Sequence, residues 1–396
     1  MTSSELDAEL LAIARAIADP DHPVKRDVAA WAATHLAQED RIGGDRELRF
    51  AAADWKRCAD RGIHGVRVPT ALGGGGADLA TTLLTLEGLG QGCRDNGLAF
   101  AIGSQILSTQ ETIVRFGTPE QQERWIPPLI KGEAYGAFAM TEPDSGSDAY
   151  QVATRAERRS DGSYVLNGHK AYITLGSRCD VVIVFASTDP DAGRWGLSTF
   201  LVPTDVDGVE RLPNRDKMGM RTTPFGDITL TDAVVPESAL VGREGAGASI
   251  FNSVLEVERS FVFATQVGAV ERQLADAIAY AGEREQGGQP IGNYQAVAHR
   301  LADMKQQHEA ARLFLYRAAI AAVSGTEVAM SAALSKLTAS ETGLAAGLAA
   351  ASVYGAKGYL SEFEVERDVR DAIGGLVYSG TSDIQRNIVA RLLGVG

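Results

Sequence analysis

The sequence predicts an α+β protein in three consecutive parts: an N-terminal α-helical domain (residues 1–130), a middle antiparallel β domain (131–240) and a C-terminal four-helix bundle domain (241–396). Two patterns support this division. Before residue 130 and after residue 246, apolar residues recur at intervals of three and four, as they do in amphipathic helices. Between these parts, short runs of β-branched and aromatic residues alternate with Gly, Asp, Asn and Pro, which is typical of strands and turns.

The first part is predicted to be a series of helices interrupted by one glycine-rich loop at Gly73–Gly76. Thr118, Pro119 and Glu120 supply an N-cap, a first-turn proline and an early acid, so a further helix is expected to begin there. The preceding helices are predicted at Ala29–Gln38, Phe50–Arg61, Leu79–Leu89 and Ala99–Phe116.

The middle part is predicted to be a set of antiparallel hairpins, because Asp161-Gly162 and Asn167-Gly168 are tight-turn signals. Its strands are expected at Tyr164–Leu166, Ala171–Thr174, Val181–Ala186, Ser198–Pro203 and Asp227–Leu230.

The last part is rich in Ala and Leu with few helix breakers, which favours long helices packed as a bundle. Their apolar faces are wide enough to invite another subunit. The helices are predicted at Ser249–Gln286, Gln295–Val323, Val328–Tyr354, Glu362–Ala372 and Asp383–Leu393.

Composition excludes several classes of protein. The net charge of −13 argues against nucleic acid or an anionic membrane as the main partner. The N-terminus lacks the apolar run of a secretory signal, and no stretch approaches the roughly 18 unbroken apolar residues of a membrane span. Cys58, Cys93 and Cys179 lack metal or redox spacing, which favours a reducing cytoplasm. The six histidines form no HxxxH pair and there is no GxSxG elbow, so we expect neither a metal site nor a serine hydrolase.

Two segments are candidates for chemistry. The loop at 137–148 holds hydroxyls, glycines and a proline, and its backbone donors suit the pyrimidine edge and phosphates of a cofactor, although such a loop is often only a turn. A second glycine cluster, at 242–247, lacks a preceding strand and is interpreted as a helix entry.

Glu258 is the other candidate. On a helix its neighbours at three and four residues are all apolar: Val254, Leu255, Phe261 and Val262. A carboxylate in such a setting is either desolvated, which raises its pKa and makes it a stronger base, or paired with a basic residue in a structural ion pair.

Several motifs together resemble the acyl-CoA dehydrogenase family. Thr141–Asp148 (TEPDSGSD) is similar to the family's TEPxxGSD, and Asn167–Thr174 (NGHKAYIT) to its NGxKxWIT. The resemblance spans nearly the whole chain in order, and its architecture is helical, β, then helical, as predicted above. Further matching segments are Met218–Arg221, Val234–Pro236, Arg284–Gln295, Leu301–Met304, Arg370-Asp371 and Tyr378–Gln385.

The resemblance implies FAD, lying between the β domain and the C-terminal bundle. Thr174 would lie near flavin N5, the atom that accepts hydride, while Arg284 and Gln295 would reach the FAD of a neighbouring subunit. A cofactor shared in this way implies an obligate homo-oligomer, in this family usually a tetramer. The other residues that the resemblance assigns to the cofactor are Phe138, Met140, Thr141 and Tyr172 at the flavin ring, Ser147 at phosphate or pantetheine, and Thr381 and Ser382 closing the site.

The resemblance also implies the chemistry: a base takes the α-proton of an acyl thioester while flavin N5 takes the β-hydride. Most members carry that base directly before Gly-Thr, where this chain has Ser379. The isovaleryl and long-chain branches carry it on a helix before an Arg instead, which corresponds to Glu258-Arg259 here. Glu258 is therefore the expected catalytic residue. Ser147, Arg259 and Ser379 are expected to contact substrate, with the Ser379 N–H polarising the thioester carbonyl, and the small Ser379 favours a short or branched acyl group.

The chain departs from the family pattern near the adenine and pyrophosphate of FAD, at Gly287, Ser352 and Ala356-Lys357, so altered FAD retention is expected. The acyl group could be held on CoA or on a carrier protein. Electron-transferring flavoprotein is the expected acceptor by family analogy.

Three functional hypotheses follow. The leading one is FAD-dependent α,β-dehydrogenation of an acyl-CoA or acyl-carrier protein. A flavin oxidase or monooxygenase on the same fold would use O2 and need no Glu at 258. A flavin-free scaffold that has lost its base at 379 is the non-enzymatic alternative.

Overall fold

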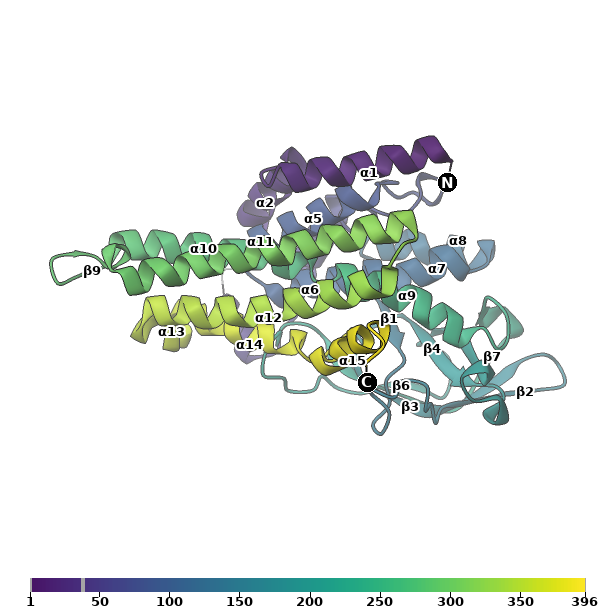
Figure 1. The fold of residues 1–396 in the computed structure, drawn as a ribbon. Helices are drawn as coiled ribbons and strands as arrows, with labels where there is room; N and C mark the ends of the chain where they lie inside the picture. The colour runs from purple at the N-terminus through teal and green to yellow at the C-terminus, as the bar shows by residue number, and fades with distance from the viewer. Residues whose placement is uncertain (1, 37–39, 396) are drawn as a thin grey trace.

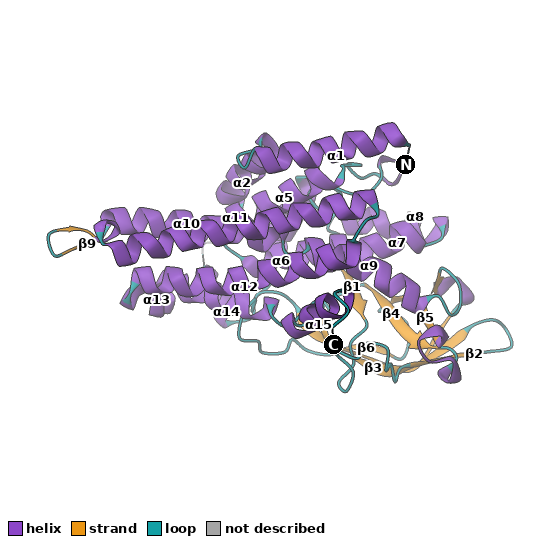
Figure 2. Cartoon of the chain, viewed as in Figure 1, coloured by secondary structure: helices purple, strands orange, loops and turns teal. Residues whose placement is uncertain are grey.

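The computed structural model describes residues 2–36 and 40–395. Helical parts at the two ends of the chain pack together, and the β domain lies beside them near α9 (Figures 1 and 2). The α+β class and the order helical, β, helical are confirmed. The N-terminal elements are α1 (Ser3–Ala18), α2 (Pro23–His35), α3 (Arg41–Arg46), α4 (Ala52–Asp60), α5 (Leu79–Gly92), α6 (Asn96–Ser104), the π-helical η2 (Gln105–Gln110), α7 (Glu111–Phe116) and α8 (Pro119–Ile130).

The predicted helix starts in this part follow from capping chemistry. Thr118 Oγ1 accepts a hydrogen bond from the N–H of Gln121, whose side chain accepts one from the Thr118 N–H, so the predicted N-cap is confirmed. The segment predicted at Ala99–Phe116 is helical throughout but switches to π-helical hydrogen bonding at η2. The helix predicted to reach Gln38 leaves helical geometry after His35, and Gln38 itself lies outside the described residues.

The middle part forms a sheet whose strands run in the order β6-β7-β3-β2-β4-β5-β8, with β1 paired to β4. Most pairings are antiparallel, as predicted, but β1 runs parallel to β4, so the expectation of hairpins alone is wrong at this strand. The strand β1 follows directly after α8 and pairs with β4, which comes later in the chain, so no hairpin connects these two strands. The strands are β1 (Gly136–Ala139), β2 (Arg155–Arg158), β3 (Tyr164–Thr174), β4 (Val181–Ser187), β5 (Leu197–Pro203), β6 (Val209–Arg211), β7 (Phe225–Val235) and β8 (Leu240–Val241).

The two predicted turns in this part have different outcomes. Asp161-Gly162 does turn the chain between β2 and β3, with Gly162 at φ +88°. The turn predicted at Asn167-Gly168 is wrong, because both residues lie inside β3 at a register shift. The Asn167 side chain exchanges hydrogen bonds with Asp232 of β7, so this Asn-Gly pair shapes a bulge rather than a hairpin loop.

The C-terminal part is a bundle of long helices, and the predicted helix Ser249–Gln286 is two helices rather than one. The chain leaves α-helical hydrogen bonding at Val262-Phe263, which directs α9 toward the sheet and α10 along the bundle (Figure 1). The elements are α9 (Gly247–Phe261), α10 (Ala264–Glu283), β9 (Glu285–Gln286), β10 (Gln289–Pro290), α11 (Gln295–Ser324), α12 (Val328–Tyr354), α13 (Ala356–Tyr359), α14 (Val365–Gly375) and α15 (Ser382–Leu392).

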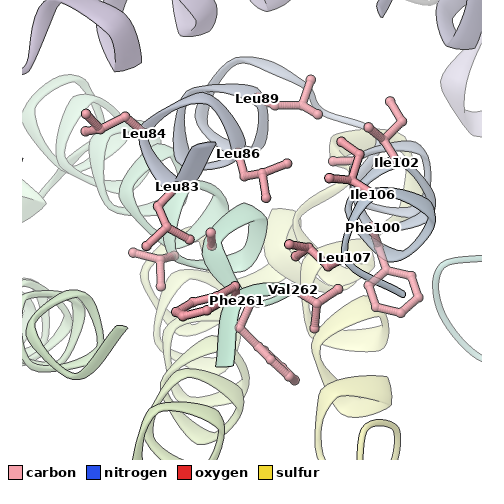
Figure 3. Packing of buried hydrophobic residues seen from close by; sticks show 14 of the residues in the cluster. Leu83, Leu84, Leu86, Leu89, Phe100, Ile102, Ile106, Leu107, Phe261 and Val262 are labelled. Atoms are coloured by element: carbon pink, nitrogen blue, oxygen red, sulfur yellow. The ribbon is translucent and has the colours of Figure 1, made fainter. Parts of the chain in front are cut away.

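The hydrophobic core around the α9–α10 junction contains residues of both helical parts. Leu83 and Leu86 of α5 surround Phe261 and Val262 at the α9–α10 junction (Figure 3). The helices α5 and α10 also approach closely, because a Cβ placed on Gly90 would lie 1.8 Å from the Thr265 carbonyl oxygen. The end of α9, where Glu258 lies, is therefore held by tight packing from the N-terminal part.

Among the described residues, no helix is both long enough and apolar enough to cross a membrane. Within the same part of the chain, no group of three or more His, Cys, Asp or Glu side chains is arranged to hold a metal ion.

Candidate active site

Glu258 lies in the last turn of α9 and faces the loop between α14 and α15. Its Oε1 accepts a hydrogen bond of 2.7 Å from the Ser379 hydroxyl. Its Oε2 is shielded from solvent and has no hydrogen-bond partner among the described residues. Burial raises the pKa of Glu258, and the Ser379 hydroxyl, Arg259 and Lys336 oppose that rise. One carboxylate oxygen is thus held in place while the other is left free in a desolvated setting.

The sequence left open that Glu258 forms a structural ion pair with a basic residue. Among the described residues, Glu258 makes no such pair. Arg259, the adjacent cation, directs its Nε to the backbone carbonyl of Ser379 at 3.3 Å. The Glu258 carboxylate and the Arg259 guanidinium therefore hold the same loop at two points, and the carboxylate is not neutralised by a direct contact.

Ser379 is positioned by a rigid turn. Its backbone adopts φ +56°, a left-handed conformation that costs energy for a residue with a side chain. Gln385 donates to the carbonyls of Ser379 (3.3 Å) and Gly380 (3.0 Å), and Thr381 caps α15. Within the described residues, nothing accepts a hydrogen bond from the Ser379 backbone N–H.

An aromatic stack supports this turn from behind. The Tyr378 ring lies between Phe100 of α6, with ring centroids 4.5 Å apart, and Phe263 of the α9–α10 junction, at 5.2 Å. Burial raises the pKa of Tyr378 far above its ordinary range, so this ring is neutral. The stack ties the turn to both helical parts.

The loop after β1 carries the first group of predicted cofactor residues. Phe138 packs against Phe185 of β4 (5.1 Å between centroids) and faces Phe251 of α9 (6.2 Å), and Met140 is buried. The chain therefore places Phe138 and Met140 where the β domain meets α9. Thr141 is half-buried, whereas Ser147 is exposed farther along the same loop.

A buried ion pair that the sequence analysis did not identify holds this loop. Lys170 of β3 donates to Glu142 Oε1 at 2.8 Å and to the Met140 carbonyl at 3.1 Å, and both side chains are buried. Glu142 also accepts from the backbone N–H groups of Ala153 and Thr154. The TEP and NGxK motifs are thus one structural unit, in which the lysine of the second motif fixes the carboxylate of the first.

Tyr172 is an aromatic side chain that remains open to contact. It has φ +62° inside a bulge of β3, and 49% of it is exposed although it belongs to a sheet. The Arg215 guanidinium lies 5.0 Å from its ring centre, and Asp227 accepts from its backbone N–H. Thr174, two residues on, is half-buried.

The start of α15 supplies a second open surface. A cavity of about 470 Å³ is lined by Thr381, Ser382 and Arg386 together with leucines of α12. The Ser382 hydroxyl and Gln385 Oε1 are buried and have no hydrogen-bond partner among the described residues. The Ser382 hydroxyl is an unpaired donor at a helix N-terminus, which fits the polar and phosphate groups of a nucleotide, and the exposed Tyr172 ring fits a flat ring system. These residues are consistent with FAD.

Two predicted cofactor residues lie elsewhere. Arg284 and Gln295 flank the β9–β10 hairpin, are exposed, and lie at the end of the bundle that points away from the sheet (Figure 1). They cannot meet a cofactor beside the same chain's Tyr172. Gly287 lies in this hairpin, with φ +60°.

Comparisons with known proteins decide the family. Three family descriptions match successive segments: acyl-CoA dehydrogenase, N-terminal domain (residues 21–133), middle domain (137–233) and C-terminal domain (245–394). The chain belongs to the acyl-CoA dehydrogenase family. It is accordingly an oxidoreductase of the class that acts on CH–CH bonds, and it is a flavoprotein whose cofactor is FAD.

Several members of the acyl-CoA dehydrogenase family are similar over almost the whole chain. The L-prolyl-[peptidyl-carrier protein] dehydrogenase of Pseudomonas fluorescens is 37% identical, over 94% of this chain and 98% of that protein. The crystal structure of the prolyl acyl carrier protein oxidase AnaB has a TM-score of 0.91 at 39% identity, with 94% and 98% of the two chains covered. PigA with FAD and proline has a TM-score of 0.88 at 33% identity, with the same coverage.

Proposed function

We propose that this flavoprotein dehydrogenates an acyl thioester and that Glu258 removes the α-proton. The observation that carries the proposal is the state of its carboxylate: Oε1 is anchored by Ser379, while Oε2 is desolvated and unpaired. A poorly hydrated carboxylate with a raised pKa is a stronger base than an exposed one. Desolvation and anchoring together make Oε2 the atom that accepts the proton.

The remaining groups act around this transfer. FAD, when bound, supplies the acceptor for the electron pair of the substrate's β C–H bond. The Ser379 N–H has no acceptor among the described residues, and we expect it to donate to the thioester carbonyl and to stabilise the charge that develops there as the α C–H bond breaks. Arg259 keeps that N–H in place by holding the carbonyl of the same residue. Phe138, Met140, Thr141, Tyr172 and Thr174 form the surface for the flavin ring, with Thr381 and Ser382 closing the site.

We further propose that the acyl group is small and is delivered on a carrier protein. Two relatives with prolyl-carrier activity in their names match 94% of the chain. The stack of Phe100, Tyr378 and Phe263 packs behind the turn whose Ser379 holds Glu258, and we infer that it limits the room for a long acyl chain. The exposed Ser147 would contact the phosphate or pantetheine of the arm that carries the acyl group.

An oxidase is the second candidate, because AnaB is described as an oxidase. The two enzymes differ only in how the reduced flavin is reoxidised: its electrons pass either to a protein such as an electron-transferring flavoprotein or to O2. An oxidase that acts on an acyl thioester would still need Glu258 to take the α-proton, unlike the oxidase considered from the sequence, which needs no Glu there. The rate at which air restores the yellow colour of the reduced protein separates them.

Arg284 and Gln295 complete the site only in an oligomer. We propose that they contact the FAD of a second copy of the chain, because they are exposed and lie at the end of the bundle distant from their own β domain. A guanidinium is suited to the pyrophosphate of that cofactor. A tetramer in light-scattering measurements would agree with this arrangement, and a monomer that retains FAD would contradict it.

The experiment is an anaerobic titration of the purified yellow protein, followed in the visible spectrum. Prolyl-carrier protein, free proline, and short, branched and long acyl-CoAs are added separately. Bleaching by prolyl-carrier protein but not by free proline supports a carrier-bound substrate. Bleaching by an acyl-CoA alone would support the dehydrogenase activity but contradict a carrier-bound substrate. A protein that stays oxidised with every thioester would contradict both parts of the proposal.

A further inference from the structure

Lys336, in the middle of α12, is a buried lysine that no motif singled out. Its side chain is fully buried, and its Nζ has no hydrogen-bond partner among the described residues. No described carboxylate lies within 4.0 Å of it, so it forms no direct ion pair. A buried ammonium without a hydrogen-bond acceptor among the described residues is costly, so an electrostatic partner slightly farther away is expected.

That partner is Glu258. The helices α12 and α9 pack together, and the Ser335 hydroxyl donates to the Ser260 carbonyl at 3.2 Å, which places Lys336 beside the last turn of α9. The Lys336 ammonium lies 5.7 Å from the ring centre of Phe263, the ring that stacks on Tyr378. Lys336 and Glu258 attract each other electrostatically, and Glu258 Oε2 is likewise buried without a hydrogen-bond partner among the described residues.

The other groups around Glu258 are already engaged or neutral. From α9, Arg259 is directed to the Ser379 carbonyl. From the α14–α15 turn, Tyr378 is neutral at ordinary pH because burial raises its pKa. From α12 and α15, Glu341 and Arg386 influence Lys336 but pair with each other.

The charged groups of α7 contact α9 at Ser253, more than one helical turn before Glu258. Arg115 of α7 donates to the Ser253 hydroxyl, farther back along α9, and pairs with Glu111. Within residues 2–36 and 40–395, Lys336 is therefore the cation that faces Glu258 without a hydrogen bond to another group.

We propose that Lys336 is a positioning residue for the base: its buried ammonium keeps Glu258 ionised from a distance and leaves Oε2 free to take the substrate's α-proton. A lysine in direct contact would donate a hydrogen bond to that oxygen and compete with the proton. A cation beyond hydrogen-bond range stabilises the negative charge without occupying the atom. This inference rests on the proposed function of Glu258.

The experiment measures the ionisation of Glu258 in two ways in the FAD-loaded protein. The first is the infrared C=O band of protonated Glu258 as a function of pH without substrate, identified by its loss in Glu258→Gln. The second is the pH dependence of anaerobic flavin bleaching by the accepted thioester. Lys336→Met and Lys336→Gln remove the charge, Lys336→Arg keeps it, and Lys25→Met removes a buried lysine that is paired with Glu271 on α10.

The neutral variants should move both midpoints to higher pH by about one unit, since an opposite charge nearby lowers a carboxyl pKa by roughly that amount or more. Lys336→Arg and Lys25→Met should stay near the wild-type midpoint. A purely structural lysine would lower the melting temperature and the rate at every pH without moving either midpoint, and that result overturns the inference. If Glu258→Gln is still bleached at the wild-type rate, the proposed function fails instead, while the infrared midpoint continues to test Lys336.

Discussion

The hydrogen bond from Ser379 to Glu258 should set the pH at which the enzyme becomes active. The Ser379 hydroxyl opposes the rise in the Glu258 pKa, because it donates to the charged form at 2.7 Å. A hydrogen bond to a charged group contributes about 1.5 to 3 kcal/mol. At 1.36 kcal/mol per pKa unit, its removal should raise the Glu258 pKa by about one to two units.

The perturbation is Ser379→Ala paired with Ser379→Gly. Both variants remove the hydroxyl, but glycine relieves the strain that serine and alanine both bear at a φ of +56°, so the glycine variant should be more stable than the alanine variant by about 1 kcal/mol. The assay is the rate of anaerobic flavin bleaching by saturating thioester across pH.

The sign follows from the direction of the shift. The base acts as a carboxylate, so the rate rises with pH through the Glu258 pKa, and a raised pKa moves this rise to higher pH. Both variants should lose about tenfold or more below the new midpoint and little above it. An unchanged midpoint in both would refute the reasoning, and a shift in the glycine variant alone would assign the effect to the change in backbone strain.

Two further predictions concern the cofactor surface. Lys170→Met leaves the buried Glu142 carboxylate without its cation, which should cost about 3 to 5 kcal/mol of folding stability. Thermal melts with and without added FAD measure this loss of stability. The double variant Lys170→Met/Glu142→Gln should recover part of it. Arg284→Ala should lower FAD retention after gel filtration, while Lys305→Ala, an exposed change on α11, should not. Equal retention in Arg284→Ala and wild type would show that this guanidinium does not hold the cofactor.

Local chemistry in the sequence predicts much of this fold. The N-cap at Thr118, the Gly73–Gly76 loop and the Asp161-Gly162 turn depend on residues within one or two turns of chain, and the structure has each of them. The Asn167-Gly168 turn was mispredicted because its Asn is engaged by Asp232, more than sixty residues away. A hydrogen bond to another strand is invisible to a local pattern.

The same limit applies to the site. The apolar neighbours of Glu258 are consecutive turns of one helix, so its isolation was readable from the sequence, as was its place before Arg259. The contact with Ser379 joins residues 121 positions apart, and it depends on the break at Val262-Phe263, where a continuous helix was expected. Lys336 could have been noticed as a charged residue in a run of Ala, Ser and Leu, but only the packing of α12 on α9 shows which carboxylate it faces.

The most direct test of the account is flavin bleaching in Glu258→Gln compared with Glu256→Gln. Glu256 lies on the same helix and lines a cavity with Gln110 and Arg115, so its variant controls for the loss of one carboxylate from α9. Both proteins should purify yellow and bind the thioester. The account predicts that Glu256→Gln bleaches anaerobically and that Glu258→Gln stays oxidised. Bleaching of Glu258→Gln at the wild-type rate would contradict the claim that this carboxylate is the base.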